Sequence, residues 1–355
     1  MTAPRITTVI PTFRRPRLLR RAILSAQAQT CRDLVISVAD NASGDDTASV
    51  VAALASRDQR IRYHSYAENR GATANFQYGM EQVDTEFFSF LSDDDLIFPG
   101  FYEAALKALE EHPDAGFFCS RVVLYDADSG RHSLMPRSGW SPGLKMAGTC
   151  ALRMLKSPFT WTGVVFRTDA ARRCDPLEPL PAADLLFLTG AAARWSFVVD
   201  LTPWALFTTW REGIFTSMPV EEMQETFRTT HRRLASLSSI GAAEAAEMGR
   251  FLAAKPARIA GGRLKRAFRD EDWESFDKLA AFLADSGEKR RSKRLRLALG
   301  RLRRSSPYLV HTACRLLAWY ESAARHRRPG AATLPLEAVV RLHAPALAAQ
   351  LEREK

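Results

Sequence analysis

Hydrophobic and polar positions alternate along the first third of the chain in a pattern that predicts strands and helices in turn. Short apolar runs predict strands, and apolar residues at helical spacing predict the helices between them. The predicted strands are residues 6–11, 34–39, 61–66 and 86–91, and the predicted helices are residues 17–29, 47–56, 71–82 and 99–111. This alternation with short connections favours a mainly parallel sheet with helices on both faces.

The alternation loosens after residue 112. The pattern there predicts strands at 115–125, 160–167, 195–200 and 204–210, a helix at 182–193, and a long Gly-, Pro- and Ser-rich excursion at 132–158. From about residue 219 the chain is rich in Ala, Leu and Arg, which indicates helices throughout. We therefore expect an α/β domain over 1–218, with parts 1–112 and 113–218, followed by an all-α region over 219–355.

Polar residues follow three of the predicted strands at the point where each strand ends. The clusters are Pro11-Thr12, Asp40-Asn41 and Asp93-Asp94-Asp95. The carboxyl ends of parallel strands converge on one crevice, so these side chains are expected to lie together. Adjacent carboxylates repel one another, and a divalent cation with oxygen ligands relieves the repulsion. The alternative is a solvated turn that caps the next helix.

The net charge and the cysteine count indicate which kinds of binding partner and cellular compartment suit the protein. The net charge of +10 and the sequence pI near 9.6 favour an anionic partner: a phosphate-bearing ligand, an anionic membrane or nucleic acid. The five cysteines are odd in number and form no CxxC pair, which argues against a disulfide framework or zinc site and fits a reducing compartment. We see no signal peptide and no transmembrane run, and expect a cytoplasmic protein.

Four segments of the first half resemble the family 2 glycosyltransferases of the GT-A fold. They are residues 9–15, 38–47, 69–72 and 90–95, which read VIPTFRR, VADNASGDDT, NRGA and FLSDDD. The resemblance covers roughly residues 5–215 and leaves the tail uncovered. It implies a Rossmann-like sheet that binds a nucleotide-diphospho-sugar together with a divalent metal.

The resemblance also implies roles for individual residues. The nucleotide-sugar site would be lined by Pro11, Thr12, Arg14, Asp40, Asn69, Gly71 and Asp93. Asp40 would bond the base edge, and Gly71 would let the backbone approach the ligand closely. Mn²⁺ or Mg²⁺ would be held by Asp94 first, and then by Asp93 or Asp95. Ser92 stands where the family commonly has the first Asp of its Asp-x-Asp motif, so we interpret Asp93 as taking that role.

Sugar transfer needs two kinds of help. A nucleotide diphosphate leaves when its developing charge is neutralised, and the acceptor hydroxyl needs a base. The resemblance implies inversion, with an Asp at the start of a helix in the second half as the base. Asp184 is our candidate, although Ala183 replaces the usual Glu; the alternative is that Asp184 caps its helix. Asp175 and Glu178 are the fallback bases.

Two further features fall on the acceptor side of the predicted site. Trp161-Thr162-Gly163 matches a family segment near the acceptor, with a core aromatic as the alternative. Arg211 would bind the diphosphate, with a surface arginine as the alternative. The QxxRW motif of processive members is missing, which favours addition of a single sugar.

Residues 289–304 carry nine Lys or Arg and no acid, with leucines on one helical face. The first interpretation is a solvated helix face. The second is peripheral contact of residues 289–320 with the anionic inner face of a membrane. Nucleic acid is disfavoured because no nucleic-acid-binding pattern accompanies the charge. The tail would aid membrane docking or self-association.

The sequence thus predicts a metal-dependent, inverting glycosyltransferase of cell-envelope polysaccharide biosynthesis. It would move one sugar to a hydroxyl of a glycan, lipid-linked or cell-surface acceptor. A nucleotidyltransferase is one rival, disfavoured because residues 11–15 lack the Gly-rich loop of that class. A non-catalytic nucleotide-sugar-binding scaffold is the other, which Ser92 and Ala183 leave open. The sugar, the base, the acceptor and the oligomeric state stay undetermined.

Overall fold

The computed structural model describes residues 3–210, 217–285, 311, 315 and 334–353. The chain divides into two compact units. The first, which we call the sheet unit, consists of Met1–Trp210, Arg233–Glu244 and Ala332–Lys355. The second, the helical unit, consists of Arg211–Arg232 and Ala245–Ala331. The domain boundary expected after residue 218 stays a prediction.

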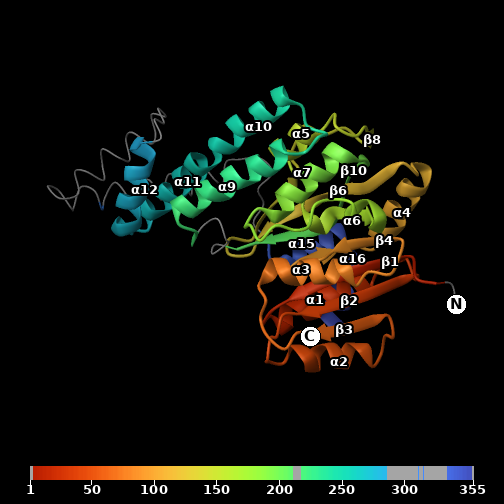
Figure 1. The fold of residues 1–355 in the computed structure, drawn as a ribbon. Coiled ribbons are helices and arrows are strands. Elements are labelled where there is room, and N and C mark those ends of the chain that lie inside the picture. The colour runs from red at the N-terminus through yellow and green to blue at the C-terminus, as the bar shows by residue number, and fades with distance from the viewer. Residues whose placement is uncertain (1–2, 211–216, 286–310, 312–314, 316–333, 354–355) are drawn as a thin grey trace. The chain divides into compact units, whose positions relative to one another are not determined.

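The first half of the sheet unit alternates strands and helices as predicted (Figure 1). Its elements are β1 (Ile6–Thr12), α1 (Pro16–Gln27), β2 (Leu34–Asp40), α2 (Thr47–Ala55), β3 (Ile61–Ser65), α3 (Ala72–Glu81), β4 (Phe87–Phe90), β5 (Leu96–Ile97) and α4 (Phe101–Glu111). Pro16 begins α1 at a position where its missing N–H costs no helical hydrogen bond.

The second half of the sheet unit is more varied. Its elements are β6 (Ala115–Asp126), β7 (Arg131–Met135), β8 (Gly143–Lys145), α5 (Ala151–Lys156), the 3-10 turn η1 (Trp161–Gly163), β9 (Val164–Arg167), α6 (Thr168–Arg172), α7 (Ala183–Arg194) and β10 (Ser196–Thr209). The predicted excursion at 132–158 therefore contains two short strands and a short helix.

The described strands form one mixed, mainly parallel sheet, which confirms the predicted fold class. The strand order is β3-β2-β1-β4-β9-β6-β10-β5, with β7 added beside β6 and β8 beside β10. Strands β3, β2, β1 and β4 are parallel, and β9 runs antiparallel to both β4 and β6. Thr12 is level with Asp40 in the register, so the carboxyl ends of β1 and β2 meet at one edge.

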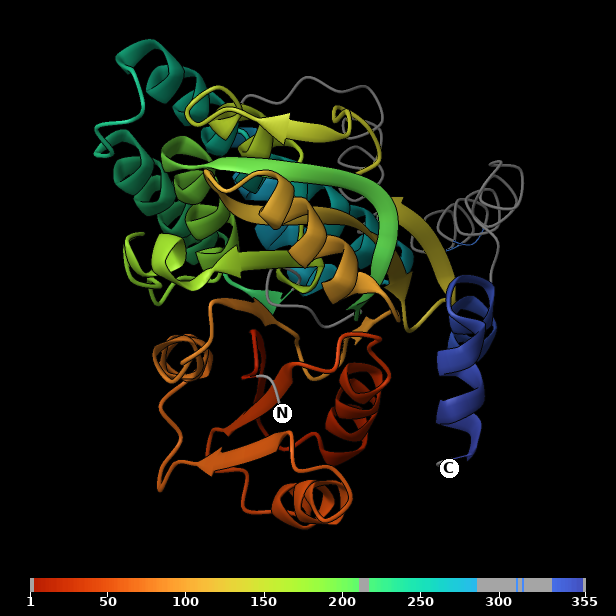
Figure 2. The same ribbon diagram turned by 90° about the vertical axis from the view of Figure 1, so that its right-hand side faces the viewer.

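Successive residues of the central strands face two different cores. Ile10 and Val38 pack with apolar residues of α1 and α4 in one cluster. Val9 and Phe90 pack with residues of α3, α5 and α7 in the other. Because neighbouring residues of a strand point to opposite faces, these two clusters place helices on both sides of the sheet. Figure 2 shows the sheet from the side.

Three predicted strands differ in the structure. The strand expected at 160–167 begins only at Val164, because the chain first makes the turn η1, in which Thr162 bonds to Asp95. The strands expected at 195–200 and 204–210 are one continuous strand, β10, with register irregularities between Asp200 and Ala205. The local apolar pattern could not reveal either detail, since both depend on partners far along the chain.

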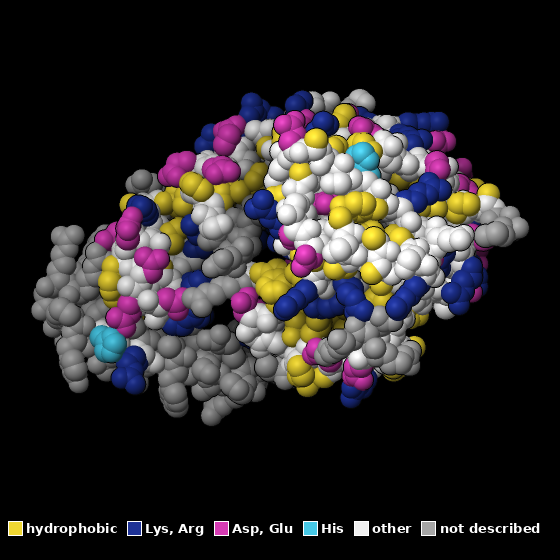
Figure 3. All heavy atoms as spheres, turned by 90° about the horizontal axis from the view of Figure 1, so that it is seen from below, with side chains coloured by type: hydrophobic (Ala, Val, Ile, Leu, Met, Phe, Trp, Pro, Cys, Tyr) yellow, Lys and Arg dark blue, Asp and Glu magenta, His cyan; other side chains and the backbone are white. Residues whose placement is uncertain are grey.

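The C-terminal region is helical, as predicted. Its elements are α9 (Val220–Ala235), α10 (Ala242–Ala253), α11 (Lys255–Arg269), α12 (Trp273–Asp285), α15 (Leu336–His343) and α16 (Pro345–Arg353). No helix among the described residues is both long and apolar enough to cross a membrane. The basic stretch 289–304 lies outside the described residues, as do residues 289–320 apart from His311 and Arg315. On the face drawn in Figure 3, basic and acidic side chains are interspersed.

Helices α15 and α16 belong to the sheet unit although they end the chain. Val340 and Leu347 are buried in a cluster with Leu96 of β5 and Leu206 of β10. The ring of His343 stacks on Phe98, with the ring centroids 6.0 Å apart. The last described residues therefore cover an edge of the sheet whose strands lie more than a hundred residues away in sequence.

Helix α3 packs tightly on β1 at Gly79, and a substitution there tests this contact. A Cβ atom at Gly79 would lie 2.4 Å from Cγ1 of Val9, whereas one at Gly190 of α7 would make an ordinary contact of 3.5 Å with Leu237. We expect Gly79→Ala to lower the free energy of unfolding by about 1–3 kcal/mol through overpacking. Gly190→Ala is the matched control and should be neutral or stabilising, because alanine favours helices. Urea unfolding followed by circular dichroism measures both; equal effects would contradict the packing described here.

Candidate active site

A cavity of about 420 Å³ opens at the carboxyl ends of β1 and β2 and beside the chain that follows β4. It is lined by Pro11, Thr12, Phe13, Arg15, Asn41, Asn69, Gly71, Ala72, Asn75, Phe76, Ser92, Asp93 and Asp94. We call it the strand-end pocket. The three polar clusters that follow the strands in sequence therefore meet in space, as the parallel topology requires.

Asp93 and Asp94 face this pocket side by side, and both form an ion pair with the guanidinium group of Arg15. Thr12 Oγ1 donates to Oδ2 of Asp93 at 2.7 Å. Arg15 Nη1 lies 3.2 Å from Oδ1 of Asp93 and 3.2 Å from Oδ2 of Asp94. Trp210, at the end of β10, donates its indole N–H to the same oxygen of Asp94 at 2.8 Å. Donors from β1, from the start of α1 and from the end of β10 thus hold the two carboxylates.

Asp95 has a different role from its two neighbours. Its side chain is buried, and its two oxygens accept hydrogen bonds from Thr162 Oγ1 and from Thr208 N, the latter at 2.7 Å. Burial, and then the charge of Asp94, raise the pKa of Asp95 well above its ordinary value. Asp95 is not among the residues that line the pocket. Asp95 ties the turn after β4 to η1 and β10. In the sequence alone, this structural role cannot be distinguished from metal binding.

Burial also perturbs Asp93. Its side chain is 8% exposed, and desolvation raises its pKa to about 6, against the opposing effects of the Thr12 hydrogen bond and the Arg15 charge. A carboxyl group in a site poorly reached by water is costly to ionise unless a cation lies beside it. The Asp93–Asp94 pair is therefore a place where added positive charge is strongly favoured.

Asp40 lies behind the pocket wall. Ser43 donates to Oδ1 of Asp40 through both its hydroxyl and its backbone N–H, and Tyr63 OH donates to Oδ2 at 2.7 Å. Burial, and then the bond to Asp40, raise the pKa of Tyr63 to about 12. The neighbour Asn41, which belongs to the predicted polar cluster but received no role in the nucleotide-sugar site, is the residue of this strand end that lines the pocket.

The loop before α3 is shaped by asparagine side chains. Asn41 Nδ2 and Gly71 N both donate to Oδ1 of Asn69 at 2.8 Å. Gly71 has φ of +85°, a backbone conformation that favours glycine, and it lines the pocket as expected. Asn75 was also missed: its Nδ2 donates to Ala39 O at 2.8 Å, while its Oδ1 is buried and has no partner among the described residues.

Arg15, and not the predicted Arg14, lines the pocket. Arg14 has φ of +54°, and its N and Nε atoms donate to the hydroxyl and the carbonyl of Ser43 at 2.8 and 3.1 Å. Its bonds therefore fasten the loop after β1 to the loop after β2. Two adjacent arginines look equivalent in sequence, and the backbone conformation at Arg14 decides which one faces the pocket.

Trp161 lies in the aromatic core. Its ring centroid is 4.6 Å from that of Phe90, 5.4 Å from that of Phe187 on α7, and 6.1 Å from that of Phe76. Phe76 also lines the strand-end pocket. A continuous aromatic cluster therefore connects the wall of this pocket to α7.

Asp184 lies in the first turn of α7, where the backbone N–H of Leu185 donates to its Oδ1 at 2.7 Å. Ala182 is the N-cap residue, so Asp184 does not cap the helix by occupying that position. Asp184 is not among the residues that line the strand-end pocket, so its approach to a bound substrate stays a prediction. Arg211 lies outside the described residues.

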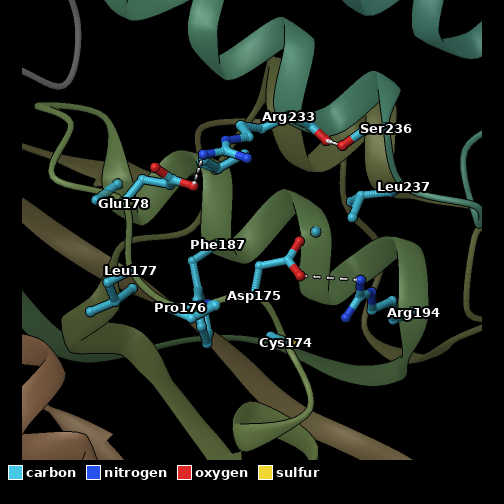
Figure 4. A pocket seen from close by; sticks show the side chains of 13 residues that line it. Cys174, Asp175, Pro176, Leu177, Glu178, Phe187, Arg194, Arg233, Ser236 and Leu237 are labelled. Carbon is cyan, nitrogen blue, oxygen red and sulfur yellow. Dashed lines mark hydrogen bonds and ion pairs between the residues drawn. The ribbon is translucent and has the colours of Figure 1, made fainter.

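The two fallback bases line a second cavity, of about 260 Å³, beside α7 (Figure 4). Glu178 pairs with Arg233 at 2.8 Å, and Asp175 pairs with Arg194 at 3.5 Å. Leu177 and Phe187 form apolar parts of the wall. Each of these two acids thus pairs with an arginine on the wall of the second cavity.

The carboxylates of the strand-end pocket suit a divalent cation whose remaining coordination positions are filled by a bound ligand. Among the described residues no group of three or more His, Cys, Asp or Glu side chains is arranged to enclose a metal. Mg²⁺ and Mn²⁺, however, are commonly held by one or two carboxylates plus the phosphates of a substrate. Asp93 and Asp94 supply those carboxylates, and the pocket leaves room for the phosphates.

The raised pKa of Asp93 predicts a pH effect on stability. Because the folded state binds this proton more tightly than the unfolded state, its contribution is largest at low pH and is lost as pH rises from about 4 to 6. The loss is at most about 3 kcal/mol. Asp93→Asn removes it, so the free energy of unfolding of the variant relative to wild type should rise over that interval, measured by urea titration in EDTA. Asp114→Asn, at an exposed turn, is the control; a pH-independent difference for Asp93→Asn would contradict the assignment.

Comparison with known proteins shows which proteins this chain resembles. Residues 7–174 match the model described as Glycosyl transferase family 2. A GalNAc(5)-diNAcBac-PP-undecaprenol beta-1,3-glucosyltransferase of Campylobacter jejuni is 39% identical over 115 residues, which are 32% of this chain and 36% of that protein. An uncharacterized glycosyltransferase of Rickettsia typhi is 33% identical over 134 residues, 37% of this chain and 40% of that protein. The chain therefore spans well under half the length of these curated relatives.

Two solved structures share the fold. TarS 1-349 of S. aureus in complex with UDP-GlcNAc superposes with a TM-score of 0.55 at 16% identity, over 87% of this chain and 90% of that chain. The mannosyltransferase PcManGT of Pyrobaculum calidifontis in complex with GDP-Man and Mn²⁺ gives 0.53 at 15% identity, over 91% and 86%. The fold is thus GT-A-like. The family match covers the strands and loops that build the strand-end pocket, from residue 7 to residue 174, which is just under half of the chain.

Proposed function

We propose that the chain is an inverting, metal-dependent glycosyltransferase that moves one sugar from a nucleotide-diphospho-sugar to a hydroxyl group of an acceptor. The observation that carries the proposal is the Asp93–Asp94 pair, which faces a pocket at the carboxyl ends of the strands beside Arg15. Carboxylates and a guanidinium in one pocket suit a ligand that brings both a divalent cation and phosphates.

The pocket walls support a nucleotide as the ligand. Gly71 has no side chain between its backbone and the pocket, and Asn75 presents a buried acceptor without a protein partner among the described residues. A ribose hydroxyl or a base N–H would satisfy that acceptor, since buried polar atoms are normally paired. The two solved structures with this fold bind UDP-GlcNAc and GDP-Man, and we extend the nucleotide-sugar class, without the base, to this chain.

Asp94 and Asp93 would hold Mn²⁺ or Mg²⁺. When bound, the cation would neutralise the charge that develops on the diphosphate as it departs. Asp95, which we expected as a further ligand, is assigned a supporting role, because both of its oxygens accept hydrogen bonds from Thr162 and Thr208. Fixed carboxylates of this kind require no rearrangement during the reaction, which is the condition for electrostatic catalysis.

The reaction would be a single displacement. The acceptor oxygen forms a bond to the anomeric carbon, the bond from that carbon to the β-phosphate oxygen breaks, and its electron pair stays with the diphosphate. The proton of the acceptor hydroxyl passes to the Asp184 carboxylate. Attack opposite to the leaving group inverts the anomeric centre. What supports this assignment is the aromatic cluster that joins Phe76 of the pocket wall, through Trp161, to Phe187 of α7, because the helix of Asp184 then packs on the same core as that wall.

The acceptor is proposed to be a lipid-linked glycan. The Campylobacter jejuni relative carries an undecaprenol-linked diphosphate substrate in its name. Such an acceptor lies at a membrane surface, so we propose peripheral attachment at the inner membrane face through residues 289–320. Flotation with vesicles of anionic or neutral phospholipid would test that attachment for the full chain.

Asp94→Asn tests the donor site. We expect wild-type protein to melt at a higher temperature with one class of UDP-, GDP-, dTDP- or CDP-sugar, and only when Mn²⁺ is present, because a ligand of the native state stabilises it. Asp94→Asn should lose this shift and, on the removal of one preorganised metal ligand, about 100-fold or more in kcat. Asp114→Asn is the control and should behave as wild type. Wild-type protein that shows no shift with any of the four classes would contradict the donor site, and a shift without sugar transfer would favour the non-catalytic scaffold.

Asp184→Asn tests the base. Because the amide cannot accept the acceptor's proton, kcat should fall about 10²- to 10⁴-fold, while the affinity for the nucleotide and the melting temperature stay unchanged. Asp175→Asn, in the second cavity, is the matched control and should keep its kcat. If Asp175→Asn lost its activity and Asp184→Asn kept it, the base would be Asp175 instead of Asp184.

A further inference from the structure

In this structure the positive charge that lies between Asp93 and Asp94 is the guanidinium of Arg15. A single nitrogen of Arg15, Nη1, lies 3.2 Å from an oxygen of each carboxylate. That is the position between the two acids that a shared divalent cation would take. A guanidinium and a metal ion held this close to the same oxygens would repel each other strongly, so one must leave when the other arrives.

The three side chains are anchored to different degrees. Asp93 and Asp94 are 8% and 14% exposed, and neutral donors hold them independently of Arg15: the Thr12 hydroxyl and the Trp210 indole. The Arg15 side chain is 50% exposed. Ion pairs with an exposed, flexible partner are weak. The carboxylates are therefore the fixed part of this cluster, and the guanidinium is the part that can move.

A displaced Arg15 side chain would remain within the ligand's reach. Arg15 is the N-cap residue of α1, and it lines the same pocket as Asn69 and Gly71. The positive end of the helix also begins there, which favours an anion beside it. Arginine matches phosphate oxygens with two parallel N–H donors, so a diphosphate in this pocket would be a better partner than the carboxylates that it leaves.

Charge balance points the same way. Among the residues that line the pocket, the ionisable ones are Arg15, Asp93 and Asp94, with a net charge of −1. A diphosphate alone would enter a negative site, and a divalent cation alone would have to displace Arg15 without giving it a new partner. When both bind together, the divalent cation binds the two carboxylates, and the diphosphate oxygens accept hydrogen bonds from the guanidinium of Arg15.

We propose that Arg15 is an exchangeable counter-ion: it holds the Asp93–Asp94 pair in the empty enzyme, is displaced by the divalent cation, and then binds the donor's diphosphate. The binding of cation and nucleotide is consequently cooperative. This inference rests on the proposed function, because it requires a diphosphate-bearing donor in the strand-end pocket.

The test measures Mn²⁺ binding, with no turnover involved. Free Mn²⁺ is followed by its electron paramagnetic resonance signal during titration of the full chain, alone and with UDP, GDP, dTDP or CDP. Wild-type protein should bind Mn²⁺ weakly alone and about 10-fold more tightly or better with one of the nucleotides; by linkage, Mn²⁺ must strengthen nucleotide binding by the same factor.

Arg15→Gln should change the two affinities in opposite directions. Without a competing guanidinium, Mn²⁺ alone should bind about 3- to 10-fold more tightly, whereas the nucleotide in saturating Mn²⁺ should bind about 10-fold more weakly, so that the coupling falls toward unity. Arg17→Gln removes the same charge from an exposed position of α1 and is the matched control. It should change neither affinity by more than about 2-fold, because exposed charges are screened.

Arg15→Lys separates charge from geometry. It keeps the positive charge but loses the bidentate donor, so Mn²⁺ alone should stay as weak as in wild type while the nucleotide affinity recovers only in part. Melting curves of each variant confirm that it is folded.

The outcomes separate this inference from the function beneath it. Wild-type protein that binds none of the nucleotides, with or without Mn²⁺, would overturn the proposed function and the inference with it. Cooperative binding in wild type that persists unchanged in Arg15→Gln would leave the glycosyltransferase intact and overturn the counter-ion role alone. A loss of nucleotide affinity in Arg15→Gln without any gain in Mn²⁺ affinity would do the same, since Arg15 would then bind phosphate but not compete with the metal.

Discussion

The burial of two neighbouring carboxylates at the end of a strand is the constraint on which the site depends. Asp93 and Asp94 lie where water reaches them poorly, and like charges at this separation destabilise each other. The protein offsets this with directed donors: a hydroxyl from β1, a guanidinium from the start of α1, and an indole from the end of β10. None of these donors is close to the aspartates in sequence.

The sheet topology brings these donors to the aspartates. β10 pairs with β5, which begins immediately after the aspartates, and this pairing brings Thr208 and Trp210 to them. β1 pairs with β4 on the other side and brings Thr12. The aspartates therefore stand between two strands separated by about two hundred residues of chain, and the carboxylate pair can be held only once both are in place. Asp95 adds a buried link from the same turn to η1.

The parts that the sequence predicts well are those that local pattern controls. Alternating apolar runs fixed the strands and helices of the first half to within two residues at most ends, and parallel topology then required that Thr12, Asn41 and Asp93 meet. The inward turn of Asp95 could not be predicted, because three consecutive aspartates are chemically identical until Thr162 and Thr208 distinguish them. The choice of Arg15 over Arg14 depends on a positive φ at Arg14, and the return of α15 and α16 depends on burial against β5 and β10.

The aromatic core imposes a second constraint, which is the distance between the strand-end pocket and α7. Phe76 is both a wall of the strand-end pocket and a neighbour of Trp161, and Trp161 packs against Phe187 in the second turn of α7. Aromatic side chains packed at crystalline density cannot shift independently. The helix that carries Asp184 is therefore packed on the same aromatic cluster that forms part of the wall of the strand-end pocket. A shared buried face of this kind holds the two elements at a fixed spacing, because neither can move without repacking the core.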